Sequence, residues 1–446
     1  YVAATNDNEK AVVVELLPPP QDEVKEHQSE GDSGSEKEKK ANPVEAVASM
    51  ITDGGKRLIC AVSRSDKKAS LYSLSVPVGD TEKMPPLAFH KLPRRSCCLD
   101  ITLIEDECEG KTRSEAILIA GDLAGDATAY PIPDSSNNTP ALSKRRVLLG
   151  TVSMLTGVGV VSDSGVQRIL TSDRDEKVRV SSFPNSFIVQ GYLLGHTAFI
   201  SSLDIAMDNG CTRCVTCSGD GTVRLWDYVS FQELAMTKAP QKDLPKSESN
   251  GKPQDGKGEK ENTEEPDGKK QAHKVVIPTS TAISPDGTLV AAIWDGLDSI
   301  YLFSVEGTDS NCTFTKPQSI LCPTSPLSVS FTSNGSLCVL AKDPTFILTY
   351  EIERSTSGEI AIKPLSGSSQ ICETLREIAK EQNISMPGSV LETDESGRIK
   401  FSKDREKQGF EVREPWNRIE RKEKARISSS RRKKRKKEEN KKQGRQ

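Results

Sequence analysis

The sequence predicts an all-β fold in which one four-stranded unit repeats around a closed ring. The first observation is a recurring pattern, an Asp in a tight turn followed by a short alternating strand, which occurs at Asp66, Asp175 and Asp220. The second is a spacing of about 45 residues between units, which is the length of one four-stranded propeller blade. Closing such a ring leaves only short, protected strand edges. We therefore predict a seven-bladed β-propeller.

The unit that ends at Asp227 shows the repeat most completely. A Gly-His pair opens it, and an Asp-Gly turn joins its second and third strands. In blades of the WD-repeat type, His196, a hydroxyl of Thr216 or Ser218, Asp220 and Trp226 can form a buried hydrogen-bonded set, and the low dielectric of the interior strengthens each bond. His196, Asp220 and Trp226 are therefore predicted to be structural rather than catalytic. The strands expected here are residues 199–206, 213–218 and 222–227.

Five further units fit the same plan. Two have their tight turn at Asp66 and Asp175, and three more show two β-rich runs joined by a Gly, Asp or Pro turn and followed by an aromatic residue. The chain begins at Tyr1 in what reads as the middle of a strand, so we expect the true N-terminus to be missing. Strands that we expect to belong to a first or closing blade are residues 2–5, 10–17 and 399–402.

Two insertions and a tail depart from the repeat. Residues 18–42 and 238–274 are rich in Lys, Glu, Gly and Pro and lack the apolar content that would offset the entropy of ordering. We predict that both are disordered loops within a propeller that spans residues 1–410. Residues 411–446 are predicted to form a basic tail that is largely disordered or partly helical.

The net charge of −3 hides a strong asymmetry along the chain. Residues 413–446 contain 16 Lys or Arg against 5 Asp or Glu, so the C-terminal segment is strongly basic and the rest of the chain is acidic. A compact basic block suits a nuclear import signal or contacts with an RNA backbone, although a solvated tail is also possible. On the first of these interpretations, we expect a nuclear protein. The block consists of Arg431, Arg432, Lys433, Lys434, Arg435, Lys436 and Lys437.

The cysteines and the apolar runs of the sequence indicate the kind of cellular environment in which the protein folds. Eleven scattered cysteines without a compact framework favour buried free thiols in a reducing environment. Cys211, Cys214 and Cys217 have the spacing of a metal knuckle, but the run enters a predicted strand and no second ligand pair follows, so core thiols are the expectation. No apolar run reaches the length of a membrane span, and we expect none.

Motifs that would indicate catalysis are missing from the sequence. The four histidines are His27, His90, His196 and His273, and none has an evident acid–base or nucleophilic partner. A nucleophile elbow, a phosphate loop and a zinc-protease motif are all absent. The chain is therefore not expected to be an enzyme by itself.

The turn at residues 173–179 is unusually charged for a propeller blade. Aligned with the neighbouring unit, Lys177 corresponds to Thr222 and Arg179 to Arg224, while Ser181 takes the place of Trp226. Strand alternation puts Val178 and Val180 on the opposite face from the two basic residues. In one interpretation Asp175 closes the turn and the other charges are solvated. In the other, the cluster is a partner-binding edge, because complementary charges set orientation and partner choice.

The same region carries a specific resemblance. Gly150-x-x-Ser-Met-Leu155, the run from Ile169 to Ser181, and Leu194-Gly-His-Thr-x-Phe-Ile200 resemble the non-catalytic WD-repeat subunit of eukaryotic tRNA (guanine-N7)-methyltransferase. The strong likeness covers residues 150–233. Elsewhere the likeness is architectural, and Thr156-Gly157 replaces an apolar–acidic pair that is commoner in that family.

The resemblance implies a scaffold that binds and stabilises a catalytic methyltransferase subunit in a heterodimer. The joint product would be N7-methylguanosine in the tRNA variable loop, with tRNA bound through the complex and no membrane involved. No cofactor is expected on this chain, since S-adenosylmethionine would bind the catalytic partner. An alternative is a WD-repeat adaptor in ribosome biogenesis or RNA processing. The resemblance places the partner contacts at Arg174, Asp175, Glu176, Lys177 and Arg179.

Overall fold

The computed structural model of the chain describes most of the predicted repeat. The predicted tail and the insertion at 18–42 lie outside the described residues, as does the insertion at 238–274 apart from its first three residues. For some described positions, such as 105–108 and 111–114, the structure describes the backbone alone. The described residues are 2–5, 11–16, 44–75, 83–108, 111–133, 144–208, 210–240, 276–307, 312–342, 347–354, 360–365, 373, 377, 392–393 and 399–400.

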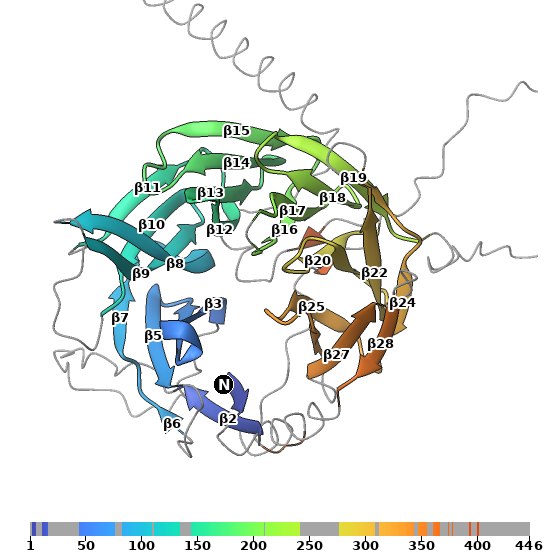
Figure 1. Ribbon diagram of the computed structural model, residues 1–446, viewed down its shortest axis with the longest axis horizontal. Coiled ribbons are helices and arrows are strands. Elements are labelled where there is room, and N and C mark those ends of the chain that lie inside the picture. The colour runs from blue at the N-terminus through green and yellow to red at the C-terminus, as the bar shows by residue number, and fades with distance from the viewer. Residues whose placement is uncertain are drawn as a thin grey trace, which may run out of the picture.

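Antiparallel sheets of four or five strands follow one another around a ring (Figure 1). A short 3-10 turn, η1 (Asp53–Gly55), joins the first two strands of the first sheet. The first three sheets contain β3 (Val44–Thr52), β4 (Arg57–Arg64), β5 (Lys68–Ser75) and β7 (Ala88–Lys91); β8 (Ser96–Cys108), β9 (Lys111–Asp122), β10 (Asp126–Pro131) and β11 (Arg146–Gly150); and β12 (Leu155–Asp163), β13 (Val166–Asp173), β14 (Lys177–Ser182) and β15 (Val189–Leu194).

Three further sheets continue the ring in chain order. In the second of them, β22 pairs with both β23 and β24, which makes that sheet five-stranded. The sheets contain β16 (Ile200–Ile205), β17 (Arg213–Ser218), β18 (Thr222–Asp227) and β19 (Gln232–Lys238); β20 (Pro278–Ile283), β21 (Leu289–Trp294), β22 (Ser299–Glu306), β23 (Thr313–Phe314) and β24 (Gln318–Leu321); and β25 (Pro326–Phe331), β26 (Leu337–Ala341), β27 (Ile347–Arg354) and β28 (Ile360–Pro364).

Each core cluster fills the space between neighbouring sheets rather than the inside of one sheet. Ile119 and Ala129 of the second sheet, for example, share a buried cluster with Leu155 and Ile169 of the third. The first strands β3, β8, β12, β16, β20 and β25 lie side by side in that order around the inside of the ring. The prediction of an all-β WD-type propeller is therefore confirmed in its four-stranded blades.

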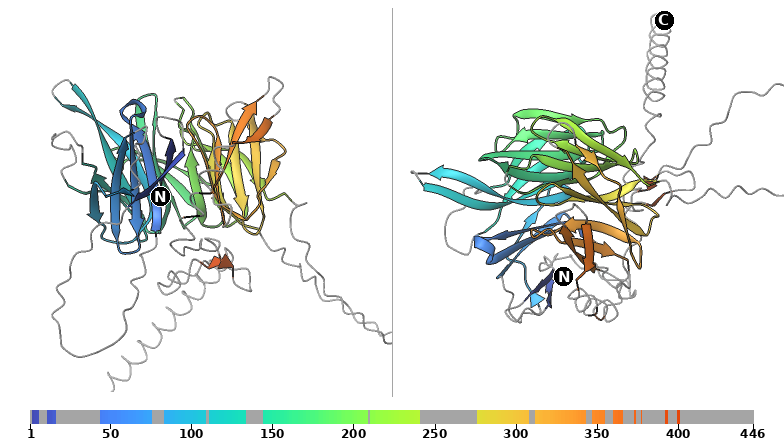
Figure 2. Two further views of the ribbon diagram at one scale, coloured as in Figure 1. Left: turned by 90° about the horizontal axis from the view of Figure 1, so that it is seen from below. Right: turned by 45° about the vertical axis from the view of Figure 1, so that its right-hand side comes forward.

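The ends of the ring differ from the six regular sheets. β1 (Val2–Thr5), β2 (Ala11–Leu16) and β6 (Lys83–Met84) form a three-stranded sheet, and Leu16 packs against the buried cluster that contains Tyr72. β29 (Glu392–Thr393) and β30 (Ile399–Lys400) pair with each other alone among the described strands, and Figure 2 shows them off the ring. The expected closure by residues 399–402 is therefore not seen in the described strands, and the count of seven blades stays a prediction.

Side chains on the inner strands tie successive sheets together. Asp100 of β8 accepts a hydrogen bond of 2.8 Å from the backbone N–H of Val160 in β12, and Asp204 of β16 accepts one of 2.9 Å from Ile283 in β20. The hydroxyl oxygen of Ser280 likewise accepts from the N–H of Val329, at 3.2 Å. Burial raises the pKa of Asp100 to about 7 and that of Asp204 to about 6. These bonds satisfy strand N–H groups that face the neighbouring blade.

Candidate functional site

The predicted structural residues meet in the blade of β16–β19. Trp226 Nε1 donates to Thr216 Oγ1 at 2.8 Å, and His196 Nε2 lies 2.8 Å from the same oxygen. His196 Nδ1 lies 3.0 Å from Asp220 Oδ2. Burial opposes ionisation of Asp220, yet the contacts with His196 and the hydrogen bonds from Thr222 hold its pKa well below the usual value. This network fixes the turn between β17 and β18.

The turn between β13 and β14 is closed by Asp173. Its Oδ1 accepts a hydrogen bond of 2.8 Å from the N–H of Asp175, and its Oδ2 lies 2.9 Å from Nζ of Lys177. The expectation that Asp175 closes this turn is therefore wrong, because its side chain is exposed and the capping carboxylate lies two residues earlier. Burial raises the pKa of Asp173, an effect that the contact with Lys177 opposes.

In the neighbouring blade, too, the turn is capped by the residue that lies two positions before the aspartate of the turn. The hydroxyl of Ser218, which aligns with Asp173, accepts a hydrogen bond of 3.2 Å from the N–H of Asp220. Glu176 has φ 75° where Gly221 has φ 83°, so a glutamate adopts the left-handed position that glycine usually takes. Arg174, two residues before Glu176, donates its backbone N–H to Met154 O at 3.0 Å, which anchors the turn on the blade's entry loop.

Arg179 is held by three acceptors of its own chain. Its Nε donates to Ser181 Oγ at 2.9 Å, and Nη2 donates to the carbonyl of Ser186 at 3.0 Å. Nη1 reaches the carbonyl of Gly150, in β11 of the preceding blade, at 3.4 Å. Ser181, where the neighbouring blade has a tryptophan, thus becomes an acceptor for the guanidinium. These three bonds fix the orientation of the Arg179 side chain, and part of the side chain remains accessible to solvent.

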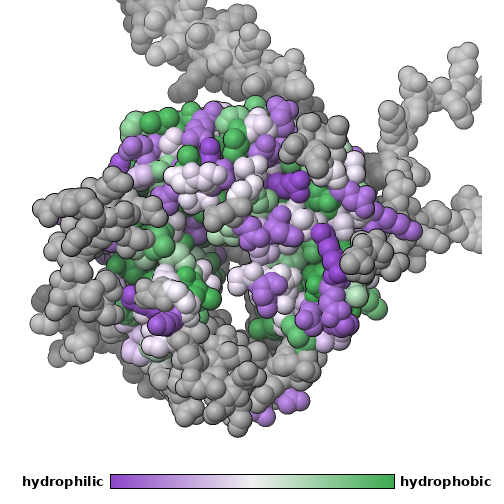
Figure 3. Space-filling model, in the orientation of Figure 1, coloured by the Kyte–Doolittle hydropathy of each residue, from purple (hydrophilic) through white to green (hydrophobic). Residues whose placement is uncertain are grey.

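Apolar side chains that sequence reasoning missed lie beside these basic residues. Lys177 pairs with Leu194 across the strands, and Arg179 pairs with Tyr192. Leu194 is 67% exposed and Tyr192 is also exposed, as is Phe187 in the loop before β15. Figure 3 shows hydrophobic and hydrophilic side chains intermixed along the upper rim, over β14 and β15. We call Lys177, Arg179, Tyr192 and Leu194 the docking edge.

One signal for this apolar surface was present in the sequence. Leu193 and Leu194 are adjacent in a strand, so alternation puts one of them inside and the other outside. The structure buries Leu193 and leaves Leu194 in solvent. Exposed apolar side chains that gather beside fixed charges are typical of a protein–protein interface.

The remaining candidate residues fall into two groups. Arg431 to Lys437 lie outside the described residues. Cys214 and Cys217 are buried in the blade core, and burial raises the pKa of both thiols. Within the ranges that the structure describes, no group of His, Cys, Asp or Glu is placed to hold a metal ion. No described helix is long and apolar enough to cross a membrane.

Comparisons with known proteins point to one family. The family model of the tRNA methyltransferase TRM82 WD40 domain matches residues 132–358. The tRNA (guanine-N(7)-)-methyltransferase non-catalytic subunit wuho of Aedes aegypti is 32% identical over 199 residues, which is 44% of each chain. The subunit wdr4 of Danio rerio is 32% identical over 231 residues, 51% of this chain and 48% of that protein. The TRM82 subunit of Debaryomyces hansenii is 30% identical over 199 residues, 44% of this chain and 41% of that protein. The chain spans less than half the length of these relatives.

Proposed function

Because the chain belongs to the tRNA methyltransferase TRM82 WD40 family, we propose that it is the non-catalytic subunit of a tRNA (guanine-N7)-methyltransferase. In this role it binds and stabilises the catalytic subunit, which forms N7-methylguanosine in the tRNA variable loop. The observation that carries the proposal is the family match over residues 132–358, a stretch that includes the whole blade of β12–β15. The relatives compared above are all named as non-catalytic subunits.

The docking edge is the surface that we propose for the catalytic subunit. Lys177 and Arg179 supply positive charge, and their internal bonds hold both side chains in one orientation before the partner arrives. Such preorganisation reduces the entropy lost on binding. Leu194 adds apolar area, and burying it would contribute roughly 1–2 kcal/mol. The partner surface that fits is apolar with acidic groups facing the two basic residues.

The predicted contacts at Arg174, Asp175 and Glu176 extend the same proposal. The three residues form the turn that leads into β14, so a partner seated on Lys177 would also meet them. The exposed carboxylate of Asp175 would face a basic group of the partner. The turn therefore adds mixed charge at one end of the docking edge, which favours a single orientation of the partner.

The methyl donor belongs to the partner in this proposal. S-adenosylmethionine would bind the catalytic subunit, and this chain would contribute no group to methyl transfer. Calorimetry with the separate subunits tests that division. Heat of S-adenosylmethionine binding is expected with the catalytic subunit and not with this chain, and saturable binding to this chain would contradict it.

We further propose that the basic block Arg431–Lys437 directs the protein to the nucleus. A run of seven basic residues is typical of an import signal. A fluorescent fusion of the full chain is expected to be nuclear, and replacing the seven residues by Ala is expected to leave it in the cytoplasm. An unchanged distribution would contradict the assignment of this block.

A variant of the exposed leucine gives the sharpest test of the docking edge. Leu194→Arg changes a side chain that is 67% exposed, whereas Lys177→Glu would place a second carboxylate beside the buried Asp173 and disturb the fold. Leu321→Arg, on the outer strand β24, is a matched control because Leu321 is 76% exposed. Leu194→Arg is expected to reduce co-purification with the catalytic subunit at least about tenfold.

The control separates this result from a folding defect. Both variants are expected to unfold at the temperature of the wild-type chain, and Leu321→Arg is expected to co-purify normally. If Leu194→Arg retains the catalytic subunit as well as Leu321→Arg does, the docking edge is wrongly placed. If the unmodified chain fails to retain any tRNA (guanine-N7)-methyltransferase subunit, the proposed function itself is wrong.

A further inference from the structure

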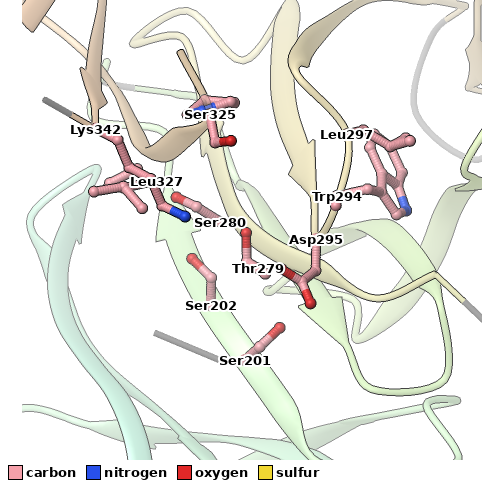
Figure 4. A pocket seen from close by; sticks show the side chains of 13 residues that line it. Ser201, Ser202, Thr279, Ser280, Trp294, Asp295, Leu297, Ser325, Leu327 and Lys342 are labelled. Carbon is pink, nitrogen blue, oxygen red and sulfur yellow. The ribbon is translucent and has the colours of Figure 1, made fainter. Parts of the chain in front are cut away.

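A cavity lined by both polar and apolar residues lies away from the docking edge, where three consecutive blades meet at the inside of the ring. Its volume is about 350 Å³, at the lower end of the range for ligand pockets. Ser201 and Ser202 of β16, Thr279 and Ser280 of β20, and the start of β25 line it (Figure 4). The loop after β21 and Lys342 complete the wall. This volume admits a side chain with a short piece of backbone, and no folded domain.

Some of the hydroxyl groups that line the cavity already make hydrogen bonds within the protein. Ser201 Oγ donates to the carbonyl of Pro278 at 2.8 Å, and Ser325 Oγ donates to Asp298 Oδ1 at 2.9 Å. Ser280 Oγ accepts from the N–H of Val329, which leaves its own hydrogen available. These bonds join neighbouring blades, so the wall of the cavity is part of the rigid ring.

Two other groups have no such role. Within the described part of the chain, neither Nζ of Lys342 nor the hydroxyl of Thr279 has a hydrogen bond or an ion pair. Figure 4 shows the ammonium of Lys342 pointing toward the middle of the cavity. An ammonium group that points into a cavity and has no partner there can pair with a negatively charged group of a ligand, so the site suits a ligand with a negative charge.

The opposite wall limits how much negative charge the ligand can carry. Asp295 lines the cavity on the side away from Lys342, and no ion pair joins Lys342 to it across the described residues. A phosphate group or a nucleic-acid backbone near Lys342 would also face this carboxylate, which repels it. A single carboxylate with an N–H donor close by suits both walls, because the carboxylate of Asp295, which already has an interaction of its own, can accept more than one hydrogen bond.

We propose that this cavity binds an acidic side chain of a peptide segment from a partner protein. Lys342 would pair with the ligand carboxylate, Thr279 and Ser280 would donate hydrogen bonds to it, and Asp295 would accept from a backbone N–H of the same segment. The site lies in a different blade junction from the docking edge, so it does not depend on the proposed function.

The test uses the full chain and a library of blocked hexapeptides. Selected peptides are expected to share one Asp or Glu, and replacing that residue by its amide is expected to weaken binding at least about tenfold in fluorescence anisotropy. Lys342→Gln is expected to cause a similar loss, and Lys342→Glu is expected to select basic residues instead. Lys316→Gln, an exposed lysine outside the cavity, is the matched control and is expected to bind normally.

Several outcomes would overturn the proposal. Selection of no peptide, or of peptides without a shared acidic residue, removes the assigned ligand class. Equal binding by Lys342→Gln and Lys316→Gln removes the assigned residue, provided that thermal unfolding shows both variants folded. Displacement of the peptide by inorganic phosphate at lower concentration than by acetate would assign the cavity to a phosphate ligand.

Discussion

Thr216→Val removes one oxygen atom from the centre of the buried network and keeps the shape of the side chain. Thr216 is fully buried, and its Oγ1 accepts from Trp226 Nε1 and contacts His196 Nε2, both at 2.8 Å. Valine would leave the indole N–H and one imidazole nitrogen without partners in a site that excludes water. Each unsatisfied buried group costs about 1–3 kcal/mol, so the two together are expected to lower the free energy of unfolding by about 2–6 kcal/mol.

Urea unfolding, followed by far-UV circular dichroism, measures that loss. The midpoint concentration is expected to drop while the slope stays unchanged, since the same surface is exposed on unfolding. Thr237→Val is the matched control, because Thr237 is half-buried on the outer strand β19 and its hydroxyl makes one long bond of 3.4 Å. A Thr216→Val variant within about 0.5 kcal/mol of this control would refute the reasoning, because that is the range of ordinary surface substitutions.

Two further predictions concern the inner strands and the first blade. Burial raises the pKa of Asp204 from 3.8 to about 6, so the folded state favours the protonated carboxyl group. The resulting contribution to the free energy of unfolding is fully present below pH 3.8 and is lost as the pH rises through about 6. Between those limits the wild type is expected to lose about 3 kcal/mol that Asp204→Asn does not lose, and parallel pH profiles in urea unfolding would contradict this. Lys67 has φ 65°, so Lys67→Gly is expected to raise the free energy of unfolding by about 0.5–1 kcal/mol. Lys56→Gly, at φ −91°, is expected to give no gain, and equal effects of the two glycines would refute the explanation by backbone strain.

The blade strands could be predicted to within about a residue where turn-forming residues mark the ends of the strands. The expected second and third strands at 213–218 and 222–227 coincide with β17 and β18, because the Asp-Gly turn and the buried network fix both ends. The first strand began one residue later and ended one earlier than expected. Ring closure was harder to predict, since it depends on pairing between distant parts of the chain that no local pattern specifies.

The sequence singles out the residues of the candidate site, whose role in binding a partner stays a prediction, but it does not give the contacts that their side chains make. The sequence marks residues 173–179 as unusual, yet several aspartates near a turn compete for the capping role. The structure gives that role to Asp173 because it is the one that is buried and paired with Lys177. The bonds of Arg179 to Gly150 and Ser186 depend on the packing of the preceding blade, and the exposed Leu194 depends on which face of β15 meets solvent. Both are tertiary features.

Reconstitution of tRNA methylation tests the central claim most directly. Purified catalytic subunit, this chain, tRNA and S-adenosylmethionine would be combined, and N7-methylguanosine in the recovered tRNA would be measured by mass spectrometry of its nucleosides. We predict substantial N7-methylguanosine with both proteins, little with the catalytic subunit alone, and none with this chain alone. Equal N7-methylguanosine with and without this chain would contradict the account.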